Sequence, residues 1–481
     1  MTTGTTKVGG RVGIVGTGHR ARGFSWVCYT LELVEGSTST SSLIGADTNL
    51  KANLYTTAVS ERKDTSQIVA LCDLNTERMA VHNRMLKDLG MPEAKTYLAA
   101  DFAKMLAEEK LDVLVVTTVD ATHDLYIVPA VEAGIRVLTE KPMTTDVAKC
   151  QRILNAVKET NGSVQVLFNY RYNPVHWKVE EVIASGKIGN VKSVHFEWLL
   201  DTVHGADYFR RWHRYKDRSG GLMVHKSSHH FDLVNFWINA KPKEVFGMGQ
   251  LAFYGDKNGK KSGWARDYYR ARGSEAASTD PFAIHLEDEP SLKALYADAE
   301  ELDGYHRDMN VFADDITIED DMSVLVRYNT GATMTYHLTA YSPWEGYRVM
   351  FNGDQGRLEL EVVESSKRTP VPKGGAADGI THGEKELPNS GNTHITVQSL
   401  WGDRENIPFE TGVGGHGGGD EAMLDQIFGP RPGHEASKTA VERLSANEID
   451  GALAMAVGLA ANESFKTGNL VKIDELLGVT L

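Results

Sequence analysis

The fold is decided by the stretch Arg11-Val-Gly-Ile-Val-Gly16-Thr-Gly18-His-Arg-Ala21. A β-branched run leads into a glycine turn and then into the start of a predicted helix. Gly16 permits the tight turn, Gly18 lets a ligand approach the backbone, and Ala21 is small enough for close helix–strand packing. Free N–H groups at such a helix start bind phosphate. The pattern predicts a dinucleotide site whose contacts are Gly16, Thr17, Gly18, His19 and Arg20.

The residues that follow alternate between strand and helix patterns. Apolar runs at residues 11–15, 68–72, 113–117 and 136–139 predict buried parallel strands. Amphipathic stretches at 76–89, 122–133 and 145–158 predict helices, with Thr76 as the N-cap of the first. This alternation is typical of α/β proteins with a doubly wound parallel sheet. We expect such a dinucleotide-binding domain over residues 1–170, with a polar insertion at about 35–67.

A different pattern begins at about residue 171. Longer, partly alternating runs at 191–200, 322–328, 332–338, 347–352 and 357–362 predict strands of an open, mostly antiparallel sheet. The expectation is a larger α+β domain over residues 171–481 that binds substrate and makes subunit contacts. Residues 254–303 and 367–419 are irregular and are interpreted as insertions, and residues 446–466 predict a helix.

Composition limits the classes of function. The 481 residues are 41% hydrophobic and carry a net charge of −14, which argues against general binding to nucleic acid or to an anionic membrane. Residues 1–10 do not resemble a signal peptide, and no segment is long enough to span a bilayer. Three isolated cysteines, Cys28, Cys72 and Cys150, indicate reduced core thiols. We therefore expect a cytoplasmic protein.

Asp73 ends the second predicted strand. A carboxylate there would accept hydrogen bonds from a ribose 2′-hydroxyl and repel a 2′-phosphate, which slightly favours NAD over NADP. Asp73 lies much farther from Gly16 than the usual ~20 residues, and the insertion accounts for the difference. Two alternatives stay open: Asp73 as a plain helix cap, and Arg78 as a ligand of a 2′-phosphate.

Lys141 lies in Val137-Leu-Thr-Glu140-Lys141-Pro142, at the end of a predicted parallel strand. Ligands of such sheets bind beyond the carboxyl ends of the strands, so Lys141 is expected beside the nicotinamide. The positive charge of an oxidised nicotinamide makes the lysine easier to deprotonate. Lys141 is then suited to hydrogen-bond a substrate hydroxyl and to help remove its proton. A surface ion pair between Glu140 and Lys141 is the alternative interpretation.

These motifs resemble the glucose–fructose oxidoreductase/inositol dehydrogenase (Gfo/Idh/MocA) family. The likeness runs through Thr117-Thr-Val-Asp-Ala-Thr-His123, Glu140-Lys141-Pro142 and Asn169-Tyr-Arg-Tyr-Asn-Pro174, and it covers most of the chain outside the insertions. It implies a Rossmann-type N-terminal domain, an NAD(P)-dependent activity on a carbohydrate hydroxyl, and a homodimer or homotetramer. Thr117, His123 and Glu140 are expected to line the cofactor.

In that family, a G-G-x-x-x-D-x-x-x-H-x-x-D stretch of the second domain faces the substrate. The corresponding residues here are Gly220-Gly-Leu-Met-Val-His225-Lys226-Ser-Ser-His229-His230-Phe-Asp232. The resemblance makes His229 the expected general acid or base and Asp232 a residue that orients its neighbours. His225 replaces the usual aspartate and Lys226 is unusual, so a relative's substrate cannot be transferred directly. The spacing of His225 and His229 also suits a metal, but no H-E-x-x-H motif or cysteine cluster accompanies it, and no metal is expected.

The expected catalytic set is therefore Lys141, His229 and His225. The residues expected to bind substrate are Lys141, Arg171, Tyr172, Lys226 and Asp232. Two aromatic–cationic clusters, at residues 208–214 and 305–307, are suited either to a polyhydroxylated or charged substrate or to a subunit interface. The glycine run around His416 is either a loop over the pocket or a linker.

Three functions are compatible with these features. The first is an oxidoreductase that transfers a hydride between nicotinamide and a secondary hydroxyl, or the corresponding ketone, of a sugar, polyol or glycoside. The second is a glycoside hydrolase or lyase that uses NAD transiently, through oxidation at C3 and elimination. The third is a regulator that senses NAD(P) without catalysis, and the presence of Lys141 and His229 counts against it.

Overall fold

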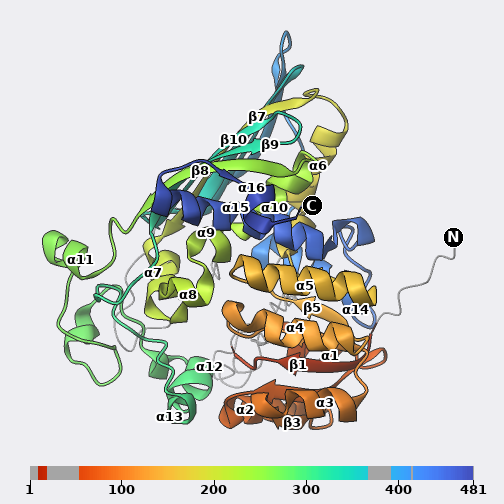
Figure 1. The fold of residues 1–481 in the computed structure, drawn as a ribbon, viewed down its shortest axis with the longest axis vertical. Coiled ribbons are helices and arrows are strands. Elements are labelled where there is room, and N and C mark those ends of the chain that lie inside the picture. The colour runs from red at the N-terminus through yellow and green to blue at the C-terminus, as the bar shows by residue number, and fades with distance from the viewer. Residues whose placement is uncertain (1–8, 19–53, 367–391, 413–414, 480–481) are drawn as a thin grey trace, which may run out of the picture.

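Two sheets organise the chain, whose computed structural model describes residues 9–18, 54–366, 392–412 and 415–479 (Figure 1). The first sheet has seven strands in the order β15-β6-β5-β4-β1-β2-β3, and all neighbours are parallel except β15 with β6. Its six parallel strands are β1 (Gly10–Val15), β2 (Ser66–Asp73), β3 (Lys95–Leu98), β4 (Val113–Val116), β5 (Arg136–Thr139) and β6 (Val164–Val166). The order reverses between β1 and β4, which is where such sheets bind ligands.

Five helices accompany these parallel strands along the chain. They are α1 (Leu54–Glu61), α2 (Thr76–Asp88), α3 (Phe102–Glu109), α4 (His123–Glu132) and α5 (Val147–Thr160). The structure confirms the Rossmann-type parallel sheet expected from the sequence. The N-cap of α2 is Asn75, whose side chain accepts hydrogen bonds from the N–H groups of Glu77 and Arg78, so the expected cap Thr76 was wrong by one residue.

The expected insertion at 35–67 extends too far toward the second strand. Residues 54–61 form α1, in which every residue before Glu61 is buried, and Ser66 and Gln67 already belong to β2. Helix α1 carries two threonines and a serine among its buried positions, so its sequence looks more polar than its location. The segment 19–53 lies outside the described residues, and with it His19, Arg20, Ala21 and Cys28.

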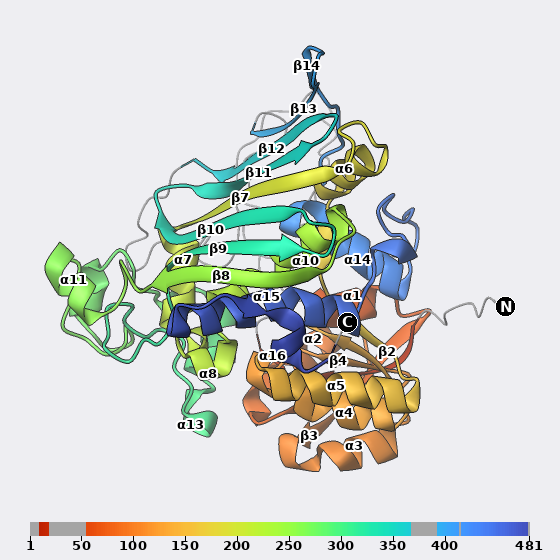
Figure 2. The ribbon, with the colours of Figure 1, turned by 45° about the horizontal axis from the view of Figure 1, so that its top comes forward.

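The second sheet has nine strands in the order β14-β13-β12-β11-β7-β10-β9-β8-β16 (Figure 2). Only the pair β7 and β10 runs parallel, which confirms a mostly antiparallel sheet. The strands are β7 (Val191–Asp201), β8 (Pro242–Gln250), β9 (Asp321–Tyr328), β10 (Thr333–Ser342), β11 (Glu345–Gly353), β12 (Gly356–Ser365), β13 (Thr393–Ser399), β14 (Arg404–Asn406) and β16 (Val471–Lys472).

One face of this sheet packs on three helices, and together they form the largest apolar core. These are α6 (Pro174–Ala184), α10 (Ser228–Trp237) and α15 (Glu448–Thr467). The other helices of this half are α7 (Thr202–Arg210), α8 (Lys216–Ser219), α9 (Leu222–His225), α11 (Asp256–Ser262), α12 (Pro290–Leu292), α13 (Glu300–Asp303), α14 (Gly419–Phe428) and α16 (Ile473–Leu477). None of the described helices is long and apolar enough to cross a membrane.

The two halves share their cores, so a boundary at residue 170 does not separate them cleanly. Strand β15 (Ala446–Asn447) pairs with β6 of the first sheet. Met423, Ile427 and Phe428 of α14 belong to the same buried cluster as Val12 and Ile14 of β1. The carboxyl-terminal part of the chain therefore completes the amino-terminal sheet.

A second connection is made by residues 284–305, which we call the strap. Leu292 and Leu295 of the strap pack on Val81 and Met85 of α2, and α12 and α13 lie beside α2 (Figure 1). The side-chain amide of Asn75 donates to the carbonyl of Ala299 at 2.8 Å. Part of the segment interpreted as an irregular insertion is therefore docked on the dinucleotide-binding half.

Candidate active site

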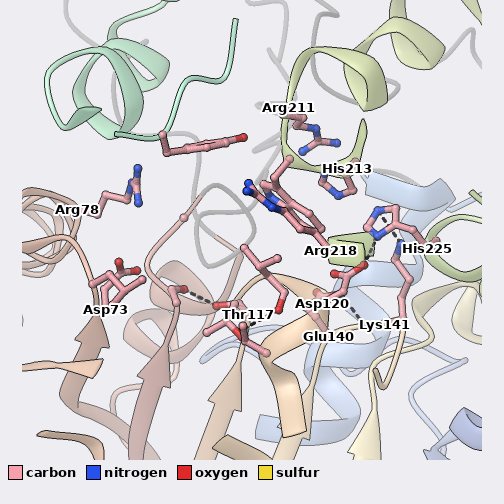
Figure 3. A pocket seen from close by; sticks show the side chains of 18 of the residues that line it. Asp73, Arg78, Thr117, Asp120, Glu140, Lys141, Arg211, His213, Arg218 and His225 are labelled. Atoms are coloured by element: carbon pink, nitrogen blue, oxygen red, sulfur yellow. Dashed lines mark hydrogen bonds and ion pairs between the residues drawn. The ribbon is translucent and has the colours of Figure 1, made fainter. Parts of the chain in front are cut away.

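A cavity of about 420 Å³ lies beyond the carboxyl ends of four parallel strands (Figure 3). One wall consists of residues that follow these strands: Gly16 and Gly18 after β1, Asp73 at the end of β2, Thr117 after β4, and Glu140 and Lys141 after β5. The second half of the chain supplies the opposite wall, with Tyr208, Arg211, Trp212, His213, Arg218, His225, Lys226 and His229. The cavity therefore lies between the two halves, at the topological switch point.

The glycine turn is shaped for close approach of a ligand. Gly16 has φ +85°, and a Cβ atom there would lie 2.7 Å from the backbone of Thr117 and Thr118. A Cβ on Gly18 would meet only the hydroxyl of Tyr296, at 3.7 Å, so the space in front of Gly18 is open. The Thr117 hydroxyl donates to the carbonyl of Val15 at 3.1 Å, which joins the ends of β1 and β4. These features fit a dinucleotide pyrophosphate.

Asp73 is held in a fixed position on the cavity wall. Its Oδ2 accepts from the Thr17 N–H at 2.6 Å and from the Thr17 hydroxyl at 2.9 Å, and its Oδ1 accepts from the Asn75 N–H at 2.9 Å. Arg78, the alternative partner of a 2′-phosphate, forms an ion pair with Asp303 of the strap at 2.6 Å. Its Nε donates to the carbonyl of Leu295 at 2.9 Å.

Lys141 reaches across the cavity to the second half of the chain. Its Nζ donates to the backbone carbonyl of His225 at 2.8 Å and lies 3.5 Å from the ring Nε2 of the same residue. Glu140 does not pair with it through a surface contact. Glu140 is buried, and its carboxylate accepts from the Tyr55 hydroxyl at 2.7 Å and from the Lys141 N–H at 3.2 Å.

His225 is anchored by an acidic residue from the opposite wall. Its Nδ1 lies 2.5 Å from Oδ2 of Asp120, which follows β4. Burial, reinforced by the charge of Lys141, holds the pKa of His225 well below its usual value. Burial raises the pKa of Asp120 well above its usual value, although the Lys141 charge opposes this. Burial thus disfavours the charged form of both groups, and their contact fixes the carbonyl and ring that face Lys141.

His229 lies in the first turn of α10, whereas His225 ends α9, and His229 lines the same cavity as Lys141. Its ring stacks on Tyr170 with 4.7 Å between the centroids. Its Nδ1 is buried and has no hydrogen-bond partner among the residues that the structure describes. Burial, together with the charges of Lys141 and Lys226, keeps the pKa of His229 well below its usual value. A neutral imidazole in this position is able to accept a proton.

Lys226 is a buried cation beside this histidine. Its Nζ lies 4.8 Å from the ring centroid of Trp198, within the range of a cation–π contact. Burial lowers the pKa of Lys226, against the nearby carboxylates of Glu345 and Glu364, which raise it. Lys226 lines the cavity and is thus placed to contact a ligand.

Three expected substrate residues are not part of the described cavity wall. Arg171 and Asp232 bind each other instead, through two buried contacts of 2.7 and 2.5 Å. The Tyr172 hydroxyl contacts Gln426 and Ser445 in the core. Helix α10 therefore turns Asp232 toward η3 (Asn169–Tyr172) and away from the cavity.

His123 was expected to line the cofactor, but the structure does not place it on the cavity wall. Its ring is fully buried, with Nδ1 3.0 Å from the carbonyl of Pro142 and Nε2 3.2 Å from that of Thr118. It does not line the cavity, but it joins the loops that carry Thr118 and Lys141. His123 therefore connects the two loops from behind the cavity wall.

Some residues of the cavity wall were predicted only as members of larger sequence clusters, and others were not predicted. From the two aromatic–cationic clusters, Tyr208, Arg211, Trp212, His213 and Tyr305 line the cavity, and so does His416 of the glycine run. Asp120 of the wall was missed, and so was Tyr55, which does not line the cavity but contacts Glu140. Asp120 could have been predicted, because it is a carboxylate that follows a predicted strand. Tyr55 could not, because it lay in the presumed insertion.

A glycine turn for a dinucleotide and a lysine on one wall, with a neutral histidine on the opposite wall, is the arrangement of a nicotinamide-dependent oxidoreductase. Comparison with known proteins shows that the chain belongs to the Gfo/Idh/MocA family of oxidoreductases. Residues 180–473 match its C-terminal alpha/beta domain, and residues 42–168 match its NAD-binding Rossmann fold. The cofactor is thus NAD or NADP.

Individual relatives agree with this assignment. The Bacillus subtilis (strain 168) protein YteT, described as an oxidoreductase, is 36% identical over 75% of this chain and 82% of its own length. The scyllo-inositol 2-dehydrogenase (NAD(+)) of the same organism is 25% identical, and the match spans 37% of this chain and about half (52%) of that relative. A solved oxidoreductase domain protein from Kribbella flavida has the same fold, with a TM-score of 0.59, 16% identity and coverage of 98% and 100% of the two chains.

Proposed function

We propose that the protein oxidises a secondary hydroxyl of a sugar, polyol or glycoside, or reduces the corresponding ketone, with NAD as the hydride carrier. The observation that carries this proposal is that Lys141 and His229, from different halves, line one cavity with the glycine turn. The match to an inositol dehydrogenase supports a polyhydroxylated substrate. Aromatic faces of Tyr208 and Trp212 on the wall suit the apolar faces of such a molecule.

Residues of this chain bind the reacting oxygen and accept the proton of the substrate hydroxyl. Bound nicotinamide supplies the hydride-accepting carbon. Lys141, fixed on the His225 carbonyl, donates a hydrogen bond to the reacting oxygen, and neutral His229 accepts the hydroxyl proton. His225 acts through Lys141 and is a positioning residue in this scheme, held by Asp120. Lys226 contacts the substrate farther from the reacting carbon.

The cofactor proposed is NAD rather than NADP. The side chain of Asp73 is fixed by the N–H groups of Thr17 and Asn75, and an acidic residue at this strand end would repel a 2′-phosphate. The charge of Arg78 is engaged with Asp303. Tight NAD binding with at least tenfold weaker NADP binding supports this choice, and equal affinities contradict it.

We further propose a cytoplasmic homodimer or homotetramer that associates through the open face of the nine-stranded sheet. Met248 and Leu325 are exposed on this face, and large exposed apolar side chains often mark an interface. Light scattering of the purified protein tests the association, and a monomer at micromolar concentration contradicts it.

The proposed reaction is tested with purified protein, NAD and a panel of sugars, inositols, sugar acids and glycosides. The expected result is a sustained absorbance increase at 340 nm with at least one compound, lost when His229 is changed to Asn. Release of sugar from a glycoside without net absorbance change identifies the hydrolase or lyase instead. NAD binding without turnover of any compound identifies the sensor.

A further inference from the structure

One carboxylate behind the cavity wall is shared by three arginines. Asp207 of α7 lies 2.9 Å from Arg307, 2.9 Å from Arg211 and 3.5 Å from Arg210. The side chains of Asp207, Arg210 and Arg307 are at most 3% exposed, and that of Arg211 is 13% exposed. Burial alone would raise the pKa of Asp207, but the three guanidinium groups hold it below its usual value. The carboxylate is therefore ionised and neutralises only one of three cations.

Within the described chain, Asp207 is the only acidic group in ion-pair contact with these three arginines, and Asp120 acts on Arg211 only over a longer distance. Arg210 Nε donates to the carbonyl of Phe282 at 2.8 Å, and the other face of Arg307 lies 5.4 Å from the Tyr296 ring. Buried Arg307 Nε has no hydrogen-bond partner in the part of the chain that the structure describes. Buried charges are stable when they are paired, so this cluster favours an additional anion nearby.

The cluster reaches the cavity through Arg211. Among the described residues, the partners of Arg211 are the carbonyl and carboxylate of Asp207, which occupy two of its five N–H groups. Arg218 lines the same wall, where it stacks on Tyr215 at 4.7 Å without an acidic partner in the described ranges. Figure 3 shows Arg211, His213 and Arg218 on the side of the cavity that faces Thr117 and Asp120.

We propose that Arg211, backed by Arg210 and Arg307 and assisted by Arg218, forms an oxyanion site on the wall supplied by the second half of the chain. The planar guanidinium forks bind phosphate or carboxylate oxygens in pairs. The site rests on the proposed function, because its ligand belongs to the bound dinucleotide or to the carbohydrate. In the first case it holds the cofactor pyrophosphate from the side opposite Gly16. In the second it selects a carbohydrate that carries a carboxylate or phosphate.

The test compares Arg211→Gln with a matched variant, Arg348→Gln, whose arginine is exposed on β11 and pairs with Glu361. Arg211→Gln leaves Asp207 with Arg210 and Arg307, so the variant is expected to fold. Calorimetry measures NAD binding to the free protein and inorganic phosphate binding to the protein saturated with NAD. Neither titration needs turnover, so the site can fail while the proposed oxidoreductase activity stands.

Two results support the site and separate its ligands. A tenfold or larger loss of NAD affinity in Arg211→Gln assigns it to the pyrophosphate. Unchanged NAD affinity, with phosphate binding to the NAD-loaded protein weakened at least fivefold, assigns it to an anionic substrate. Unchanged binding in both titrations overturns the proposal. If Arg211→Gln does not fold, exposed Arg218→Gln replaces it, with an expected threefold loss in one titration and none in the other.

Discussion

Lys141 is the residue on which the proposed chemistry depends most directly. Replacing it with Met keeps most of its length but removes the group that contacts the His225 carbonyl and the reacting oxygen. We expect turnover to fall by about 10²–10⁴-fold, the usual contribution of a proton-transfer group. The affinity for NAD should change less than about threefold, because the pyrophosphate site is separate.

The control for this variant is Lys149→Met, on α5, whose lysine pairs with Asp146. It should leave both turnover and NAD affinity unchanged. Steady-state rates at 340 nm and calorimetric NAD titrations measure the two effects separately. A Lys141→Met protein that retains wild-type turnover would show that the proton is handled elsewhere.

His176 lies away from the cavity and allows a pH prediction without catalysis. Burial lowers its pKa to about 4, while its Nδ1 and Nε2 contact the Tyr170 carbonyl and the Tyr347 hydroxyl. Below pH ~6.5 the unfolded chain protonates this histidine and the folded chain does not, so acidification costs stability. The stabilisation of wild type over His176→Gln should therefore shrink by about 2 kcal/mol between pH 7.5 and 5.

Denaturant unfolding of both proteins at the two pH values measures this difference. His434→Gln, which replaces an exposed histidine, is measured in parallel as the control. A constant gap between wild type and His176→Gln across the range would mean that His176 takes up a proton in the folded protein as readily as in the unfolded chain.

The sequence predicted the positions of some site residues and not of others. Lys141 and His229 could be placed from motifs, because each motif fixes a strand end or a helix face. Arg171 and Asp232 were expected at the substrate but bind each other, since spacing alone does not tell which neighbour a helix face meets. Asp120 contacts His225 across 105 positions of sequence, and only the tertiary path brings them together.

Among the elements, the strap supplies an acidic partner to a cavity-lining arginine of α2. Arg78 of α2 is neutralised by Asp303 at 2.6 Å. Asp303→Asn should release this arginine to a 2′-phosphate and raise NADP affinity roughly fivefold, equivalent to about 1 kcal/mol for such an ion pair. NAD affinity should not change.

Asp298→Asn is the matched control on the strap, because Asp298 pairs with exposed Lys293 and not with α2. Parallel titrations with NAD and NADP distinguish the two variants. If NADP affinity of Asp303→Asn equals that of wild type, Arg78 does not face the 2′ position.

Element prediction succeeded where apolar runs were unbroken or clearly alternating, and failed where the pattern was polar or interrupted. The four-residue strands β4 and β5 were located from their apolar runs, whereas β3, β6 and the nine-residue strand β8 were missed. Helix α1 was absorbed into the presumed insertion, because Thr56, Thr57 and Ser60 are buried despite their polar side chains. Tertiary burial decided these elements, and local sequence carried little of that information.

At the scale of the whole molecule, the two halves stabilise one another. Residues 1–170 alone would lack α14 and β15, and would expose the surface of β1 and β6 that Met423, Ile427 and Ala446 cover. We expect this truncated chain to lack a cooperative thermal transition and to bind NAD weakly. Circular dichroism and calorimetry measure both properties. A truncated chain that unfolds sharply and binds NAD like the full protein would contradict shared stabilisation.

The proposed function requires that the cavity between the halves holds a nicotinamide between Lys141 and His229. An experimental structure of the protein with NAD tests it most directly. We expect the pyrophosphate against Gly16 and Gly18, and C4 of the nicotinamide facing the Lys141 ammonium and the His229 ring. A dinucleotide bound outside this cavity, or a nicotinamide turned away from both side chains, would contradict the proposed function.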